Sequence, residues 1–109
     1  MSSQAPDMEF ESTEYDFGTM EHKGEPQSTE FHFRNTGSAP LVIIRTELSC
    51  TCIAAEYPRK PVMPGQEGTI KVTYTPKQET GPFSNNVKIY TNSADRRPEI
   101  LFVRGEVIK

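Results

Sequence analysis

The sequence predicts an all-β protein, an immunoglobulin-like antiparallel β-sandwich of about seven strands. Short segments alternate apolar and polar residues, turn-forming residues separate them at intervals of roughly 8–12 residues, and no stretch has helical periodicity. The nine prolines and seven glycines are spread along the chain, as expected of residues that mark turns. A chain of 109 residues has the length of one domain. We therefore expect a disordered lead-in over residues 1–7 and a single sandwich domain over residues 8–109.

The strands of the first third follow from alternation. Met8–Glu11 alternates apolar and charged residues, and Tyr15–Phe17 alternates again, so we expect either one first strand or two short ones. Thr29–Arg34 has the clearest period of two, with its phenylalanines, Phe31 and Phe33, pointing inward. The Asn-Thr-Gly-Ser stretch that follows provides a turn, because Asn and Gly tolerate positive φ.

Leu41–Ile44 is apolar at every position, which predicts a central strand covered on both faces. Pro40 opens this strand, since a first residue need not donate a ladder hydrogen bond. We expect the strand to continue through Leu48 as far as the cysteines. Three later segments alternate and complete the sandwich: Thr69–Tyr74 with Ile70, Val72 and Tyr74 inward, Phe83–Thr91 with Val87 and Ile89 buried, and Ile100–Ile108.

Charge and hydropathy exclude several classes of protein. The formal net charge is −3, with −7 in residues 1–30 and +4 in residues 31–109. Because the basic residues are scattered and the isoelectric point is about 5.4, the chain has no nucleic-acid footprint. No apolar run approaches the ~20 residues of a membrane span. The N-terminus has neither a basic segment nor an apolar core, so we expect either a cytosolic protein or one whose export signal has been removed.

A set of motifs follows in order along the chain after residue 7. They are Phe17-Gly18-Thr19, Phe31, Asn35, Gly37, Pro40-Leu41, Ser49-Cys50-Thr51-Cys52, Pro64-Gly65, Gly81, Phe83, Asn92 and Gly105-Glu106-Val107. This ordered set resembles a family of exported bacterial immunoglobulin-like domains of unknown function, and it is similar in outline to the major-sperm-protein-like sandwiches. The resemblance implies a seven-stranded sandwich in the periplasm or at the cell surface, often behind a lipoprotein or secretory signal, and it implies no known activity. The family usually has Gly between its cysteines, where this chain has Thr51.

The cysteine pair has three competing interpretations. On an extended strand, Cys50 and Cys52 share a face with Cα atoms about 6.6 Å apart, near the upper limit for a disulfide. Bridging them needs a bulge or kink at Thr51, whose β-branched side chain prefers an extended backbone. The pair is a structural staple or two partly buried thiols, a redox pair whose strained bridge exchanges with thiols, or a soft-metal site for copper(I) or zinc.

The sequence offers the metal interpretation no further ligands. There is no third cysteine, and nothing in the spacing brings His22, His32 or Met63 to the pair. His32 stands between two inward phenylalanines and should therefore face solvent. No nucleophile–base motif or phosphate-binding loop is present, so we predict neither an enzyme nor a cofactor.

Without a predicted catalytic site, the sheet edges and the loops are the candidate binding surfaces of the sandwich. We expect exposed edge strands at Met8–Phe17 or Glu99–Lys109, which could accept a partner strand. We also expect binding loops around residues 57–61 and 95–98. Their candidate side chains are Tyr57, Arg59, Lys60, Arg96 and Arg97.

The sequence thus favours a non-enzymatic interaction or scaffold module of the cell envelope. Its expected partner is a protein or another envelope component, and we expect a monomer. The alternative is a thiol-redox or copper(I)-handling protein that uses Cys50 and Cys52.

Overall fold

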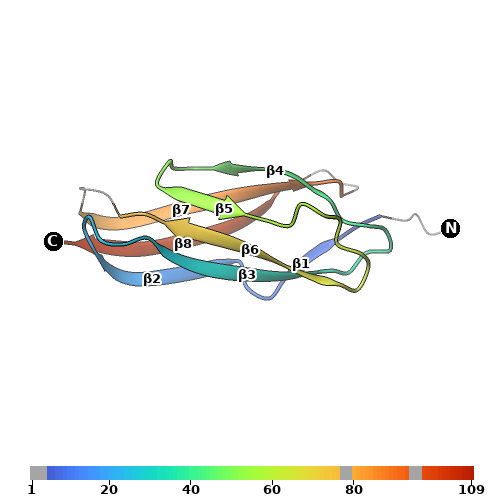
Figure 1. Ribbon diagram of the computed structural model, residues 1–109, viewed down its shortest axis with the longest axis horizontal. Coiled ribbons are helices and arrows are strands. Elements are labelled where there is room, and N and C mark those ends of the chain that lie inside the picture. Colours follow the sequence, from blue (N-terminus) through green and yellow to red (C-terminus); the bar gives the residue numbers. More distant parts are fainter. Residues whose placement is uncertain (1–4, 77–79, 94–96) are drawn as a thin grey trace.

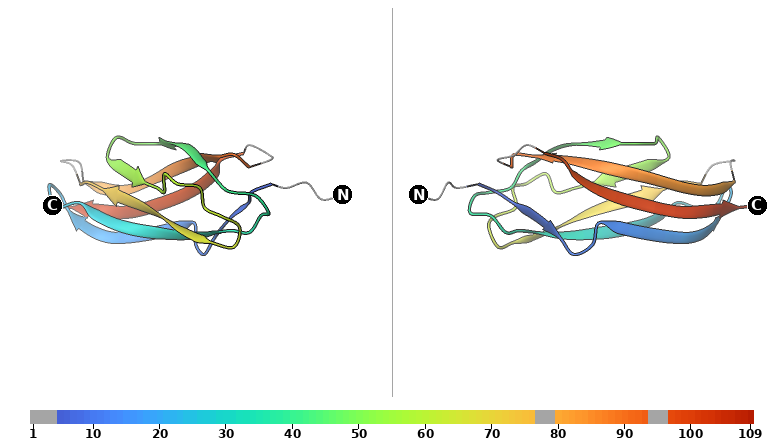
Figure 2. Two further views of the ribbon diagram at one scale, coloured as in Figure 1. Left: turned by 45° about the vertical axis from the view of Figure 1, so that its right-hand side comes forward. Right: turned by 180° about the vertical axis from the view of Figure 1, so that it is seen from behind.

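The computed structural model describes residues 5–76, 80–93 and 97–109 and confirms the all-β sandwich. Its two four-stranded sheets lie along one long axis, with overall extents of 58 × 20 × 20 Å (Figure 1). The strands are β1 (Met8–Phe10), β2 (Glu14–Glu21), β3 (Gln27–Asn35), β4 (Ile43–Leu48), β5 (Ile53–Glu56), β6 (Glu67–Tyr74), β7 (Gly81–Thr91) and β8 (Glu99–Ile108). One sheet has the order β1-β3-β6-β5 and the other β2-β8-β7-β4; the second faces the reader on the right of Figure 2. No helix among the described residues is long and apolar enough to cross a membrane.

The N-terminal stretch forms two strands in different sheets. β1 pairs antiparallel with β3, whereas β2 has crossed to the other sheet and pairs parallel with β8. The expected purely antiparallel pairing is therefore wrong for β2 and β8. The Glu99–Lys109 segment, expected as an exposed edge, is also placed differently, because β8 lies between β2 and β7. Met8–Phe17 does lie at sheet edges, since both β1 and β2 are outermost strands.

The core lies between the sheets and contains the residues that alternation predicts to point inward. Phe31, Phe33, Ile70, Val72, Tyr74, Val87 and Ile89 are all buried. Leu101, Val103 and Val107 add the inner face of β8. Each sheet also pairs a phenylalanine with a glycine across two strands: Phe33 lies opposite Gly68, and Phe83 lies opposite Gly105.

The segment before the cysteines differs most from expectation. Leu41 is fully buried but forms only an isolated bridge with Val62, and β4 begins at Ile43. β4 is an edge strand, so the predicted central strand covered on both faces is wrong. Ile44 occupies a bulge in the pairing with β7 and is 58% exposed. The short strand β5 has no counterpart in the expected strands.

The lead-in expected over residues 1–7 is described only from residue 5. There the chain runs beside the turn after β3. The backbone N–H of Thr36 donates to the carbonyl of Asp7 at 3.0 Å, and that of Ser38 donates to Ala5 at 2.9 Å. A Cβ at Gly37 would collide with this segment, which explains the glycine at that position.

Candidate functional site

The two cysteines are joined in a disulfide in the connection between β4 and β5. This connection takes the chain from the edge of one sheet to the edge of the other. The bridge encloses one residue, Thr51, and links no distant strands.

The backbone at the disulfide is a turn rather than an extended strand. The Cα atoms of Cys50 and Cys52 are 5.2 Å apart, well inside the range that a bridge requires. The turn includes Thr51, so the kink that the sequence makes necessary does form despite the β-branched side chain. The backbone N–H of Cys52 donates to Cys50 Sγ at 3.1 Å.

A chain of side-chain hydrogen bonds leads from β7 to the disulfide. The backbone N–H of Asn86 donates to Ser49 Oγ at 2.9 Å, and the Ser49 hydroxyl donates to Asn85 Oδ1 at 3.3 Å. Asn85 Nδ2 in turn donates to Cys52 Sγ at 3.7 Å. Sequence analysis missed Asn85 and Asn86. The available signal was two consecutive asparagines inside a predicted strand, where this residue type is depleted.

The metal interpretation needs free thiolates, and in this form the two sulfurs are bonded to each other. His32 lies on the outer face of β3, where its Nδ1 is 3.2 Å from Thr69 Oγ1. It is exposed, as expected. Across the described ranges, no group of three or more His, Cys, Asp or Glu residues could hold a metal ion.

A disulfide that encloses so short a loop should stabilise the fold only slightly. Loop-closure entropy for three residues corresponds to about 1.5 kcal/mol, at the low end of values for disulfides. We expect the reduced protein to remain folded and to lose about that much unfolding free energy. Urea titrations of the oxidised protein and of the protein kept in a phosphine reductant test this. Complete unfolding on reduction at 25 °C would contradict it and identify the bridge as a structural staple.

The proposed binding loops are only partly described. Tyr57 is half-buried against the core, and the Arg59 guanidinium lies 4.9 Å from its ring centroid. Lys60 and Arg97 are exposed, whereas Arg96 lies outside the described residues. The loop between β5 and β6 lies towards the end of the sandwich where β1 is found (Figure 1). This loop holds an Arg–aromatic stack in which Arg59 is exposed and Tyr57 is half-buried.

The outer faces of the two sheets differ in chemistry. The outer face of the β1-β3-β6-β5 sheet is polar, and its residues pair across the strands. These pairs are Ser28 with Thr73 at 2.7 Å, His32 with Thr69 at 3.2 Å, and Arg34 with Glu67 at 3.4 Å. On the outer face of the other sheet, Ile100 and Phe102 are 36% and 43% exposed. They alternate with buried Leu101 and Val103, and so lie on one face of β8.

Ile100 and Phe102 lie beside a second group on the same face. Lys88 on β7 pairs with Ile100 on β8, and Glu47 on β4 pairs with Lys88. The Arg45 guanidinium is 4.0 Å from the Tyr90 ring centroid, and the Tyr90 hydroxyl donates to Glu47 at 2.9 Å. This hydrogen bond lowers the pKa of Glu47 and raises the pKa of Tyr90.

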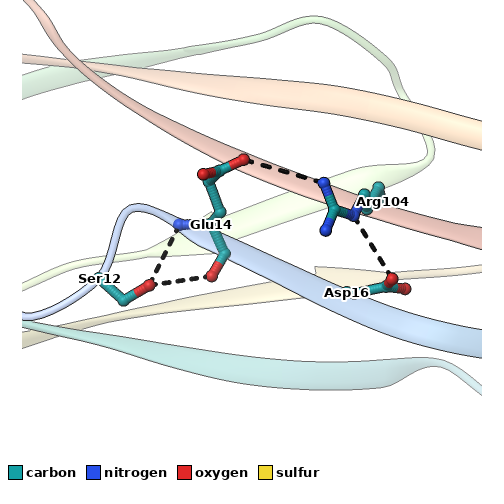
Figure 3. A network of polar contacts seen from close by, with 4 residues as sticks. All are labelled: Ser12, Glu14, Asp16 and Arg104. Carbon is teal, nitrogen blue, oxygen red and sulfur yellow. Dashed lines mark hydrogen bonds and ion pairs between the residues drawn. The ribbon is translucent and has the colours of Figure 1, made fainter.

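On the far side of Phe102, Arg104 lies between two carboxylates of β2 (Figure 3). Its Nε is 3.4 Å from Asp16 Oδ2, and its Nη1 is 3.9 Å from Glu14 Oε1. The Gly18 backbone N–H donates to Asp16 Oδ1 at 2.8 Å and, with Arg104, lowers the pKa of Asp16. All three side chains are exposed, so these ion pairs fix the positions of the charged groups on this face but contribute little to the stability of the fold.

Comparison with known proteins assigns a family and a fold. The family model described as "Protein of unknown function (DUF1573)" matches residues 8–107. A protein of unknown function from Porphyromonas gingivalis W83 superposes with a TM-score of 0.80 at 21% identity, covering 97% of this chain and 49% of that one. This chain thus spans about half the length of that protein. No curated protein matches the sequence.

Two further structures share the fold at lower identity. The ASH/PapD-like domain 7 of human CEP192 gives a TM-score of 0.72 at 10% identity, covering 100% of this chain and 90% of that one. The secreted serine protease VesC from Vibrio cholerae gives 0.68 at 12% identity, covering 92% of this chain and 23% of that one. At these identities the likeness is one of fold alone.

Proposed function

This chain belongs to the family described as "Protein of unknown function (DUF1573)", and we propose that it is a non-enzymatic interaction module of the cell envelope. Its partner is a protein that binds the outer face of the β2-β8-β7-β4 sheet. The observation that carries this proposal is the pair of exposed apolar side chains, Ile100 and Phe102, on that face. Aromatic side chains and Arg are enriched in the core of protein interfaces, and Tyr90 with Arg45 supplies both nearby.

The charges of this face favour a protein over an anionic polymer or lipid. Arg45 lies 3.4 Å from Glu47, and Lys88 lies opposite the same carboxylate. Arg104 lies between Glu14 and Asp16. An anionic surface would have to displace these carboxylates, whereas an apolar protein surface could bind while leaving them in place.

The sheet edges are less suited to binding a partner strand. β1 has three residues and β5 has four, which limits the ladder that either could offer. Bulges interrupt the registers of β2 and β4. Short edge strands and bulges are devices by which proteins avoid edge pairing, so the face is the better candidate.

The geometry supports binding rather than catalysis. A hollow of about 510 Å³ near β1 is lined mainly by loop residues and small side chains, together with the carboxylates of Asp7 and Glu99. Its lining, within the described residues, includes no histidine or cysteine to act as base or nucleophile. Asp16, Glu47 and Tyr90, whose pKa values are shifted, lie outside the lining of this hollow.

Placement in the cell envelope is supported by the resemblance to exported domains and by the disulfide. Disulfides persist in oxidising compartments and are rare in the cytosol. Fractionation of the native host, with cytoplasmic and periplasmic markers, tests the location. Recovery of the protein wholly with the cytoplasmic marker would contradict it.

Replacing Phe102 with Glu should weaken partner binding without unfolding the protein. We expect the tagged wild-type protein to retain a protein from native envelope extract and Phe102→Glu to weaken that binding by about tenfold or more. Ala54→Glu is the matched control, because it adds the same charge at an exposed position on β5 in the other sheet. Retained proteins that are the same for wild type, Ala54→Glu and Phe102→Glu would overturn the proposed surface.

A further inference from the structure

We propose that the Cys50–Cys52 disulfide is a thiol-exchange site in which Cys50 is attacked and Cys52 leaves. Asn85 stabilises the thiolate that forms on Cys52. This proposal does not depend on the interaction surface described above. It rests on the unequal exposure of the two sulfurs and on the hydrogen-bond chain from β7.

The two halves of the bridge differ in access. Cys52 is 8% exposed and belongs to the buried core, whereas Cys50 is half-buried and only packs against that core. Exchange requires a thiolate to approach one sulfur, so access helps to decide which sulfur is attacked. The more open Cys50 is therefore the electrophile.

The side-chain hydrogen bond from Asn85 matches the charge that develops on Cys52 in this direction. The backbone N–H of Cys52 donates to Cys50 Sγ at 3.1 Å and matches the charge that appears on Cys50 only when the mixed disulfide is resolved. When the bridge opens at Cys50, negative charge appears on Cys52 Sγ, to which Asn85 Nδ2 already donates at 3.7 Å. A hydrogen bond to a charged group is stronger than one to a neutral group, so this contact strengthens as the bond breaks. Stabilising the leaving thiolate accelerates exchange.

Ser49 positions the Asn85 amide for this role. Its hydroxyl donates to Asn85 Oδ1, while its oxygen accepts the backbone N–H of Asn86. The amide nitrogen of Asn85 accepts no hydrogen bond, so the Ser49 hydroxyl can donate only to Oδ1. This holds Oδ1 next to Ser49 and turns Nδ2 towards the Cys52 sulfur. Asn85 contacts a reacting atom, and Ser49 acts through Asn85.

The co-reactant is a thiol, either a small molecule or a protein side chain. Its thiolate forms a bond with Cys50 Sγ as the bond between the two cysteine sulfurs breaks, and the electron pair of that bond goes to Cys52 Sγ. A second thiolate then attacks the incoming sulfur of the mixed disulfide. This releases the oxidised co-reactant as its own disulfide and leaves Cys50 as a thiolate. The protein is reduced by two electrons, and the two thiols are oxidised by two.

The rate of reduction by glutathione tests the role of Asn85. We expect Asn85→Ala to slow the second-order rate by about tenfold, the effect of losing one charge-assisted hydrogen bond. Asn85→Asp, which keeps the shape but replaces the donor with a charge, should be slower still. Ser49→Ala should slow the reaction to a lesser degree. Asn92→Ala is the control, since the Asn92 amide bonds to Val42 and Pro40 rather than to the disulfide, and it should react at the wild-type rate.

A second readout separates this role from a purely structural one. In a Cys50→Ala background, Cys52 should react with iodoacetamide at pH 7 several-fold more slowly when Asn85 is replaced by Ala. Mass spectrometry of acid-quenched reactions should place the glutathione adduct on Cys50. An adduct mainly on Cys52, or reduction of Asn85→Ala and Asn85→Asp at the wild-type rate, would overturn the proposal.

Discussion

Replacing Asn35 with Ala should cost about 3–4 kcal/mol of unfolding free energy, the largest effect that we expect from a single substitution. Asn35 is fully buried, and its side chain forms four hydrogen bonds. Nδ2 donates to the carbonyls of Ala39 and Val62 at 2.8 and 2.9 Å. Oδ1 accepts the backbone N–H groups of Gly37 and Asp7 at 2.9 and 3.3 Å.

The cost is large because the fully buried amide serves four backbone groups at once. Truncation removes all four hydrogen bonds, each worth about 1 kcal/mol, although the Val62 carbonyl still accepts the Leu41 N–H. It also removes one of the hydrogen bonds that hold the segment at Asp7 to the turn, leaving the backbone bonds from Thr36 and Ser38. Urea titration measures the loss, and hydrogen exchange at Asp7 and Gly37 shows whether the N-terminal segment detaches.

Asn92→Ala is the matched comparison for Asn35. The Asn92 side chain also spans two backbone groups, accepting from the Val42 N–H at 2.9 Å and donating to the Pro40 carbonyl at 3.1 Å. These bonds are exposed, so water replaces them and the loss should be about 1 kcal/mol or less. Similar losses for the two variants would show that burial is not the cause.

The sequence predicts the sandwich because alternation reports directly which face of a strand is buried. Phe31, Phe33, Ile70 and Val72 follow this rule, and all are buried. The prediction of a central strand at Leu41–Ile44 fails because an apolar run does not distinguish a strand covered on both faces from a segment that leaves the core. Leu41 is buried, whereas Ile44 lies in an edge bulge and is exposed.

Strand pairing and the surroundings of the cysteines are harder to predict. The parallel pairing of β2 with β8 joins the two ends of the chain, and no local pattern specifies such a partner. The environment of Cys52 depends on Asn85, which is 33 residues away and which the sequence pattern places only within a strand. The cysteines themselves are identifiable from sequence, but the donor that distinguishes one sulfur from the other is not.

Gly68→Ala should destabilise the protein by about 2 kcal/mol, although alanine usually stabilises a strand relative to glycine. Gly68 lies opposite Phe33 in the pairing of β3 with β6. An added Cβ would lie 2.8 Å from Phe33 Cε1 and 3.1 Å from Cε2. The ring is 2% exposed and packs against Phe10 with centroids 5.7 Å apart, so it has little room to move.

Two opposing effects decide whether this substitution stabilises or destabilises the protein. Alanine restricts the unfolded chain and should contribute about 0.4–1 kcal/mol of stability where the backbone accepts it. Overpacking a buried ring costs about 1–3 kcal/mol, so the clash outweighs the gain from alanine. If the clash is the cause, Phe33→Leu should relieve it, and the double variant should lose less stability than the two single losses combined. If the loss of the double variant equals the sum of the two single losses, Gly68 is required by the backbone of β6 rather than by the ring of Phe33.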